Sequence, residues 1–277
     1  MREAWLEDRR KYIGASDAPI IMGVSPWRTP YDLWLDKLGL SEDQPDNFAM
    51  KRGREMEPIA RDAYTVMTGI VCEPRKIVHK TIPYMMANFD GIADDESITV
   101  EIKCPGREDH ELAKDGVIPE KYLPQLQHQL EVIGHNRLHY FSYRDGDGVL
   151  IEVTKDEEFI SELLAKEKEF WDYVQSATAP PLDERDYVER LDEEWKSLSS
   201  EWSQVNEEMK ALKAKEKMLR DTMISMADNK NCQGNGVRLQ KVVRKGAYDM
   251  KQIQLMVDVD LENFRKETTE TWRVSSC

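Results

Sequence analysis

The sequence contains little of what distinguishes membrane, secreted or zinc-binding proteins. No run of about 18 apolar residues is present, so no segment is expected to span a membrane. The N-terminal residues lack the apolar stretch of a signal peptide, which favours a protein of the cytoplasm. The four cysteines, Cys72, Cys104, Cys232 and Cys277, are widely spaced and form no CxxC pair. Neither a zinc site nor a disulfide scaffold is therefore expected.

Several catalytic motifs are also absent. The sequence has no G-x-x-x-x-G-K-[ST] loop, no nucleophile elbow, and no pair of histidines in a zinc-protease arrangement. The net charge of −14 argues against nucleic-acid binding, because DNA-binding proteins usually carry a basic surface. That argument is limited, since carboxylates that hold divalent cations add negative charge and a local basic channel can lie on an acidic protein.

Hydrophobic spacing predicts alternating helices and strands in the first 180 residues, followed by a different kind of segment. Helices are expected over 48–68, 122–134 and 156–175, and strands over 97–104, 138–143 and 149–153. We therefore divide the chain into a domain over 1–180, a long helix over 181–230 and a small C-terminal extension over 231–277. In the extension a strand over 237–243 and a helix over 249–262 are expected.

The middle segment carries a heptad repeat. Its members alternate by four and three residues and are Leu191, Trp195, Leu198, Trp202, Val205, Met209, Leu212, Glu216, Leu219, Met223 and Met226. All are apolar except Glu216. This pattern predicts a long helix that pairs with another helix, in the same chain, in a second copy or in a partner.

Asp90, Glu101 and Lys103 form the pattern D-(x)n-E-x-K. Residues two apart on a strand lie on one face, so Glu101 and Lys103 point the same way. Two carboxylates that face each other suit a hard divalent cation, and the backbone carbonyl of Ile102 is placed to add a ligand. Such a cation activates water, which the lysine would position or deprotonate. The alternative is a solvated strand face, because E-x-K triplets are common by chance.

Two helices offer further candidates for the same site. Glu57 lies among small and apolar residues of the 48–68 helix and is a candidate metal ligand, although a surface salt bridge with Arg54 or Arg61 is the simpler interpretation. The 122–134 helix carries three glutamines, whose amides would hold a water molecule or a phosphate, or else form an ordinary polar helix face. They are Gln125, Gln127 and Gln129, of which the first and third share a face.

The N-terminal region contains a candidate phosphate site. Arg9 and Arg10 precede Ser16, which is expected at the start of a helix. Arginine binds phosphate in a bidentate manner, and helix N-termini favour anions. The sequence does not decide which of the two arginines is involved.

Five motifs occur in an order typical of one protein family. They are IGASDA (13–18), RGREMEP (52–58), FDG (89–91), EIKCP (101–105) and YLPQLQ (122–127). This order resembles that of the YqaJ-type viral recombinases, relatives of phage lambda exonuclease among the PD-(D/E)XK nucleases. The resemblance covers roughly residues 5 to 175. The proline that usually precedes the first aspartate is missing, because Asn88 and Phe89 stand before Asp90.

The resemblance implies an α/β (α+β) fold with a mixed central sheet flanked by helices. It also implies a Mg²⁺-dependent exonuclease, with Mn²⁺ as a substitute and two ions per site, that digests one strand of duplex DNA from its 5′ end. The resemblance implies that Asp90, Glu101, Glu57 and the Ile102 carbonyl bind metal and that Lys103 serves the attacking water molecule. It implies that Gln125 or Gln127 lines the site. It also implies that Arg9 or Arg10, with Ser16, binds the 5′-phosphate.

The family also implies partners and a location. Double-stranded DNA ends, a single-strand annealing protein and a ring-shaped homotrimer in the cytoplasm of a bacterial host of a phage or prophage are expected. Two alternatives remain open at this point. One is a PD-(D/E)XK endonuclease of restriction or repair type, and the other is a non-catalytic module that binds DNA ends or protein.

Overall fold

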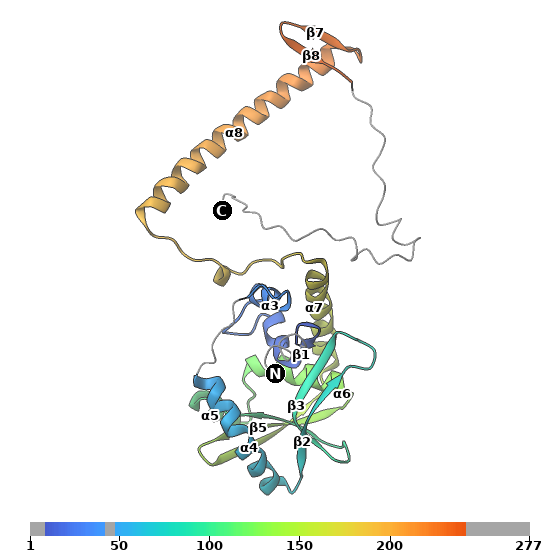
Figure 1. Ribbon diagram of the computed structural model, residues 1–277, viewed down its shortest axis with the longest axis vertical. Coiled ribbons are helices and arrows are strands. Elements are labelled where there is room, and N and C mark those ends of the chain that lie inside the picture. Colours follow the sequence, from blue (N-terminus) through green and yellow to red (C-terminus); the bar gives the residue numbers. More distant parts are fainter. Residues whose placement is uncertain (1–8, 42–47, 242–277) are drawn as a thin grey trace. The chain divides into compact units, whose positions relative to one another are not determined.

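A computed structural model describes residues 9–41 and 48–241 (Figure 1). The helix expected over 249–262 lies outside these residues. The chain divides into two compact units, Met1–Val188 and Glu189–Cys277, and each is described by itself. In the described part of the chain no helix has the length and apolarity needed to cross a membrane.

The first unit is built on a mixed six-stranded sheet. Its strands are β1 (Ile13–Gly14), β2 (Cys72–Val78), β3 (Met85–Ala93), β4 (Thr99–Lys103), β5 (Arg137–Arg144) and β6 (Asp147–Thr154). The order is β1-β3-β4-β5-β6, and β2 also pairs with β3. Pairing is parallel between β1 and β3 and between β4 and β5, and antiparallel elsewhere.

Helices surround this sheet (Figure 1). They are η1 (Ala15–Asp17), α2 (Ala18–Ile21), α3 (Pro30–Lys37), α4 (Phe48–Thr68), α5 (Arg107–Lys114), η2 (Glu120–Tyr122), α6 (Leu123–Ile133), α7 (Glu157–Ser176) and η3 (Glu184–Asp186). The starts of three helices agree with their sequences. Pro30 is the first residue of α3, Pro124 is the second residue of α6, and the Asp156 carboxylate caps α7.

Helix α4 and helix α6 cover opposite faces of the sheet. Tyr64 of α4 packs with Val100, Ile102 and Phe141, whereas Tyr140 belongs to a separate cluster. Neighbouring residues of a strand point to opposite faces, so Tyr140 and Phe141 mark the two sides of β5. The cluster around Tyr140 includes Leu126 and Leu130 of α6, which places α6 on the second face.

Because both faces are covered, β4 is buried on both sides. Thr99 is 0% exposed and Glu101 is 3% exposed, although their polarity suggested a solvated face. The alternative of a solvated strand face for Glu101 is therefore wrong. A carboxylate this deeply buried requires charged or hydrogen-bonding partners, and these are described below.

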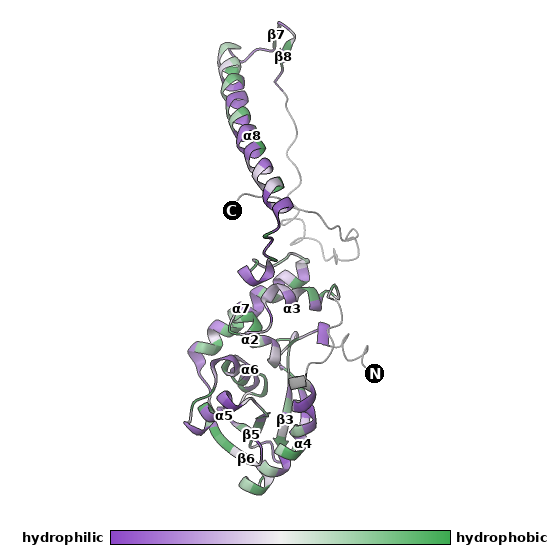
Figure 2. Ribbon diagram, turned by 90° about the vertical axis from the view of Figure 1, so that its left-hand side faces the viewer, coloured by the Kyte–Doolittle hydropathy of each residue, from purple (hydrophilic) through white to green (hydrophobic). Residues whose placement is uncertain are grey.

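The second unit contains the helix that the heptad pattern predicts. Its described residues form α8 (Glu193–Met226) and a hairpin of β7 (Cys232–Gly234) and β8 (Val237–Leu239). The Asp192 carboxylate caps α8 by accepting a hydrogen bond of 3.0 Å from the Trp195 backbone. Asn235 and Gly236 have positive φ angles of 52° and 78° and form the tight turn between the two strands. Apolar and polar residues alternate along α8 (Figure 2).

Candidate active site

The site lies where β3 and β4 separate. Their antiparallel ladder ends at the pair formed by Gly91 and Val100. One residue beyond it, the Asp90 carboxylate accepts a hydrogen bond of 2.8 Å from the backbone nitrogen of Ile102. The side chain of Asp90 thus takes the place of the next strand-to-strand bond. This brings its carboxylate to the middle of the E-x-K segment of β4.

Gly91 permits this approach of the strands. A Cβ atom at this position would lie 2.7 Å from the Cβ of Cys72 and 2.8 Å from a methyl group of Val100. Both distances are below van der Waals contact, so any side chain would push β2 or β4 away from β3. The glycine of the F-D-G motif therefore fixes the position of the aspartate before it.

Glu101 is the centre of a hydrogen-bonded group. Its Oε1 atom accepts from the Lys103 ammonium at 2.6 Å and from the Gln125 amide at 2.5 Å. Its Oε2 atom accepts from the Gln129 amide at 2.5 Å. Lys103 also donates to the Gln125 carbonyl oxygen at 2.9 Å, which closes a ring of three side chains. These hydrogen bonds and the ammonium charge compensate the cost of burying the Glu101 carboxylate, and they fix its orientation.

Charge coupling joins Asp90 to this group. Burial raises the pKa of Asp90 well above its usual range, and the negative charge of Glu101 raises it further. Burial works to lower the pKa of Lys103, but the charges of Glu101 and Asp90 outweigh it and raise the pKa. Lys103 is therefore an ammonium ion at neutral pH, and it acts as a donor and a positive charge beside the two carboxylates.

Glu57 lies near the site but is engaged with another residue. It forms an ion pair of 2.5 Å with Arg61, one turn further along α4. The Arg61 guanidinium also donates to the backbone oxygen of Asp90 at 2.8 Å. The charge of Glu57 contributes to raising the pKa of both Asp90 and Lys103. The simpler sequence interpretation, a salt bridge with Arg61, is thus observed, and this pair also ties α4 to β3.

The donor set fits a hard cation only in part. Among the described residues, no three His, Cys, Asp or Glu side chains are grouped as a metal cluster. Both oxygens of Glu101 accept from protein donors, and Glu57 is held by Arg61. All candidate ligands are nevertheless oxygens, which Mg²⁺ and Mn²⁺ prefer. A divalent cation between Asp90 and Glu101 would also relieve the repulsion that raises the pKa of Asp90.

The structure places Gln127 outside this group. Its amide nitrogen donates to the backbone oxygen of Thr154 at 2.9 Å, and its oxygen accepts from the backbone nitrogen of Asp156 at 2.9 Å. Residues two apart on a helix point in nearly opposite directions, so Gln127 faces away from Gln125. Gln129, which is 0% exposed and bound to Glu101, occupies the position expected for Gln127.

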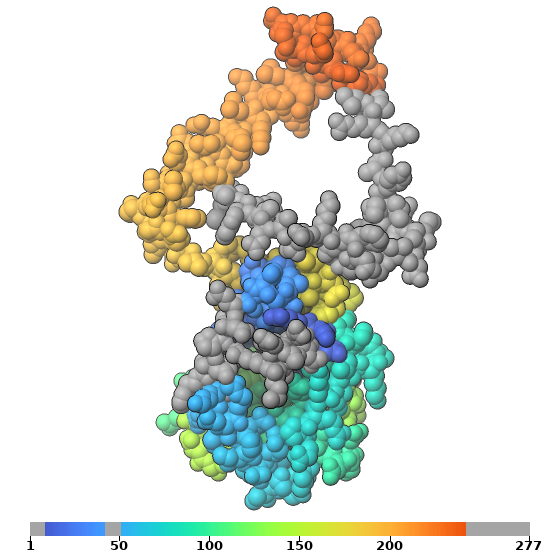
Figure 3. All heavy atoms as spheres, in the orientation of Figure 1, coloured from blue at the N-terminus to red at the C-terminus, as the bar shows by residue number. Residues whose placement is uncertain are grey.

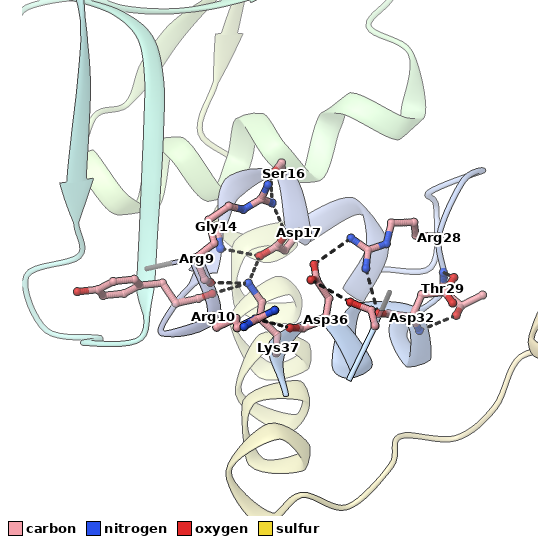
Figure 4. A network of polar contacts seen from close by, with 12 residues as sticks. Arg9, Arg10, Gly14, Ser16, Asp17, Arg28, Thr29, Asp32, Asp36 and Lys37 are labelled. Atoms are coloured by element: carbon pink, nitrogen blue, oxygen red, sulfur yellow. Dashed lines mark hydrogen bonds and ion pairs between the residues drawn. The ribbon is translucent and has the colours of Figure 1, made fainter. Parts of the chain in front are cut away.

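The second candidate site gathers around the first helical turn of the described chain (Figure 4). The Arg9 guanidinium lies 3.4 Å from the Ser16 hydroxyl and 3.4 Å from the Asp17 carboxylate. Arg10 instead donates to the backbone oxygen of Asp36 at 3.2 Å. Of the two arginines, Arg9 is thus the one that lies beside Ser16.

A buried ion pair that the sequence analysis missed supports this site. Lys37 of α3 donates to the Asp17 carboxylate at 2.6 Å, and also to the backbone oxygens of Tyr12 and Arg9 at 2.6 and 3.0 Å (Figure 4). Burial works to raise the pKa of Asp17, but the charges of Lys37 and Arg9 outweigh it and lower the pKa. Lys37 therefore fixes the backbone between Arg9 and Tyr12. Only the tertiary fold brings these residues together, so no local pattern could have indicated the pair.

Comparison with known proteins agrees with these features. Residues 4–136 match the family model of the YqaJ-like viral recombinase domain. Over these residues the chain is similar to that domain family. The chain is also 36% identical over 191 residues to the uncharacterized protein YqaJ of Bacillus subtilis. This match covers 66% of this chain and 59% of that protein. The chain thus spans about three fifths of the length of this relative.

A solved structure resembles a large part of this chain. The crystal structure of an alkaline exonuclease from Laribacter hongkongensis matches with a TM-score of 0.55 and 28% identity, covering 64% of this chain and 94% of that chain. A crystal structure of the same exonuclease in complex with dAMP matches with a TM-score of 0.56. The predicted fold, a mixed sheet flanked by helices, and the resemblance to the YqaJ-type recombinases are both confirmed.

Proposed function

We propose that the chain is a metal-dependent deoxyribonuclease that degrades double-stranded DNA from its ends in phage-type recombination. The observation that carries the proposal is the group of Asp90, Glu101 and Lys103 at the point where β3 and β4 separate. Two carboxylates and an ammonium ion in one partly buried site suit phosphodiester hydrolysis. The similarity to an alkaline exonuclease supports the same class of reaction.

The residues of this site differ in their roles. Asp90, Glu101 and the carbonyl of Ile102 would hold a divalent cation through oxygen atoms. When bound, the cation lowers the pKa of a water molecule and neutralises charge on the phosphate. Lys103, which donates to Glu101 and to Gln125, would position or deprotonate the attacking water molecule and stabilise developing negative charge. Gln125 and Gln129 hold Glu101 in place.

We assign Mg²⁺ as the cation, with Mn²⁺ as a substitute, because every available ligand is an oxygen. Two ions per site are part of the proposal. The second ion would require Glu57 to release Arg61 and turn toward Asp90.

The proposed polarity is 5′→3′. Arg9 and Ser16 offer charge-assisted hydrogen bonds to a terminal 5′-phosphate, and Lys37 and Asp17 hold them in place. Digestion from the 5′ end leaves a 3′ single strand, which an annealing protein would bind. A ring-shaped trimer that encloses the DNA remains a prediction.

The test compares linear duplex DNA with a covalently closed plasmid, each incubated with the purified full chain and Mg²⁺. The proposal predicts nucleotide release from the linear duplex and an intact plasmid. Glu101→Ala and Lys103→Ala should abolish release, whereas Lys114→Ala, which removes an exposed lysine from the same unit, should leave the rate unchanged. Far-ultraviolet circular dichroism of each variant serves as the control for folding.

The other outcomes separate the alternatives. Rapid nicking of the plasmid would indicate an endonuclease. Retained binding to DNA ends without hydrolysis in Mg²⁺ or Mn²⁺ would indicate a non-catalytic module. Full activity of Glu101→Ala would contradict the assignment of the site.

A further inference from the structure

Helix α8 carries an apolar seam along one face. Its residues recur at alternating spacings of three and four, the pattern of a coiled coil. The seam consists of Trp195, Leu198, Trp202, Val205, Met209, Leu212, Leu219, Met223 and Met226, with Glu216 in place of one apolar residue. The helix has 34 residues and is therefore about 51 Å long.

The seam is not covered within the described structure. No residue of α8 is buried there, and Leu198 and Leu212 are 57% and 66% exposed. The side chains of α8 form a rod one helix wide in Figure 3. A helix of this kind gains little stability from its own hydrogen bonds and is stabilised mainly by packing of its apolar face. A second helix of similar length, packed along the seam, would stabilise α8.

The charges beside the seam change sign along α8. The flanking positions are acidic in the first half and basic in the second. They are Glu194, Glu201 and Glu208, followed by Lys213, Lys215 and Arg220. This change of sign favours one relative orientation of two paired helices over the other, because the flanking charges of paired helices lie against each other.

A parallel pair of α8 helices in register would bring like charges together. Each seam residue would face its own copy, so Glu216 would face Glu216 within the apolar contact. Lys215 of one helix would lie beside Arg220 of the other, and these two positive charges would repel each other. Glu208 of one helix would attract Lys213 of the other, which would offset this repulsion but not the one between the two Glu216 side chains. Placing two carboxylates against each other in a contact that excludes water is unfavourable, because the like charges repel each other there.

An antiparallel pair avoids these contacts. With a twofold axis between Lys210 and Ala211, every seam position of one helix faces a seam position of the other. Trp202 then faces Leu219, so a large side chain meets a smaller one. Glu208 of each helix lies beside Lys215 of the other, which gives two attractive pairs.

The same arrangement separates the two Glu216 side chains. Glu216 of one helix faces Val205 of the other helix. Because Val205 and Glu216 are 11 positions apart in the sequence, the Glu216 carboxylates of the two helices lie about 16 Å apart along the axis. Each is also paired with Arg220 of its own helix at 3.3 Å. The polar member of the seam is therefore tolerated in the antiparallel orientation and opposes the parallel one.

We propose that α8 binds α8 of a second copy of this chain in an antiparallel coiled coil that buries the apolar seam. The arrangement is self-complementary, since the acidic half of each helix meets the basic half of the other. It is independent of the nuclease function proposed above.

The first test measures the mass of the full-length chain over a range of concentrations by light scattering. Leu212→Gln should weaken self-association by about tenfold, because the substitution places a polar group in two symmetry-related contacts. Met218→Gln is the matched control. Met218 is 60% exposed, close to the 66% of Leu212, but lies outside the seam, so its substitution should have no effect. A monomer at all concentrations, or a mass that Leu212→Gln leaves unchanged, would overturn the proposal.

The second test determines the orientation. Lys215→Glu should weaken association by about tenfold in an antiparallel pair, because it places a second carboxylate beside Glu208 in both symmetry-related contacts. The double variant Glu208→Lys/Lys215→Glu should restore it. Lys217→Glu makes the same charge change on the outer face and should have no effect. Tighter association of Lys215→Glu would indicate a parallel pair, and an unchanged constant would indicate another binding face, so either result would overturn the proposal.

Discussion

The imidazole of His128 joins three elements of the first unit. Its Nδ1 atom lies 2.7 Å from the Glu167 carboxylate of α7, and its Nε2 atom lies 2.9 Å from the backbone oxygen of Met86 in β3. Both partners are acceptors, so both ring nitrogens must carry hydrogen and the ring must be charged. Burial works to lower the pKa of His128, but the charge of Glu167 and the hydrogen bonds outweigh it and raise the pKa. The bonds hold α6, which carries Gln125 and Gln129.

We predict that His128→Leu lowers the free energy of unfolding by about 3–5 kcal/mol, because it leaves the charge of Glu167 buried without its partner. The side chains of His128 and Glu167 are 0% and 1% exposed, so water cannot replace the lost partner. The second oxygen of Glu167 has no hydrogen-bond partner among the described residues, so nothing else compensates. The double variant His128→Leu/Glu167→Met should lie within about 1–2 kcal/mol of the wild type, since it removes both charges.

Urea unfolding of the four proteins of this double-mutant cycle provides the measurement. The expected coupling free energy between His128 and Glu167 is about 2–4 kcal/mol. Lys168→Ala serves as the control, because it breaks an exposed ion pair with Asp172 on the same helix and should leave the unfolding midpoint unchanged.

The pH dependence gives a second readout of the same pair. The folded-state pKa of His128 is raised above the unfolded value of about 6.5. The stabilisation from the ion pair is therefore fully present below that unfolded value, and is lost as the pH rises through the folded-state pKa. The wild type should lose stability in this range relative to the double variant. Equal pH profiles, or a His128→Leu variant as stable as the Lys168→Ala control, would show that the His128–Glu167 ion pair does not stabilise the fold.

Gln129→Leu should slow degradation of duplex DNA by about tenfold or more, because Glu101 loses a buried donor. Gln127→Leu, the same change on the same helix, should leave the rate unchanged and lower only the melting temperature. Arg9→Ala should slow digestion of 5′-phosphorylated ends by about tenfold and spare 5′-hydroxyl ends, when the two substrates are compared at one enzyme concentration. Gly91→Ala should cost about 1–3 kcal/mol in urea unfolding, because a Cβ atom there overlaps β2 and β4.

Strong local periodicity allowed much of the fold to be predicted. The expected strand pair over 138–143 and 149–153 corresponds to β5 and β6, and the heptad pattern corresponds to α8. The short strand β1 was missed, because two residues carry no detectable alternation. The solvated face considered for β4 was also wrong, because burial on both sides depends on helices that are distant in sequence.

The site could be predicted where a motif places side chains on one strand or one helix face. Glu101 and Lys103 are two apart on β4, and Gln125 contacts both. Gln127 was misplaced, because the register of α6 against the sheet depends on tertiary packing. The Lys37 contacts were invisible for the same reason, since they join residues 20 to 28 apart in the sequence.

A time course on linear duplex DNA labelled at either the 5′ or the 3′ end, in Mg²⁺, with the wild type and Lys103→Ala, tests the proposed exonuclease activity and its site together. We expect early release of the 5′ label by the wild type, retention of the 3′ label on a growing single strand, and no release of either label by Lys103→Ala. Release by Lys103→Ala at the wild-type rate would contradict the assignment of the site. Early release of the 3′ label by the wild type would contradict the proposed polarity.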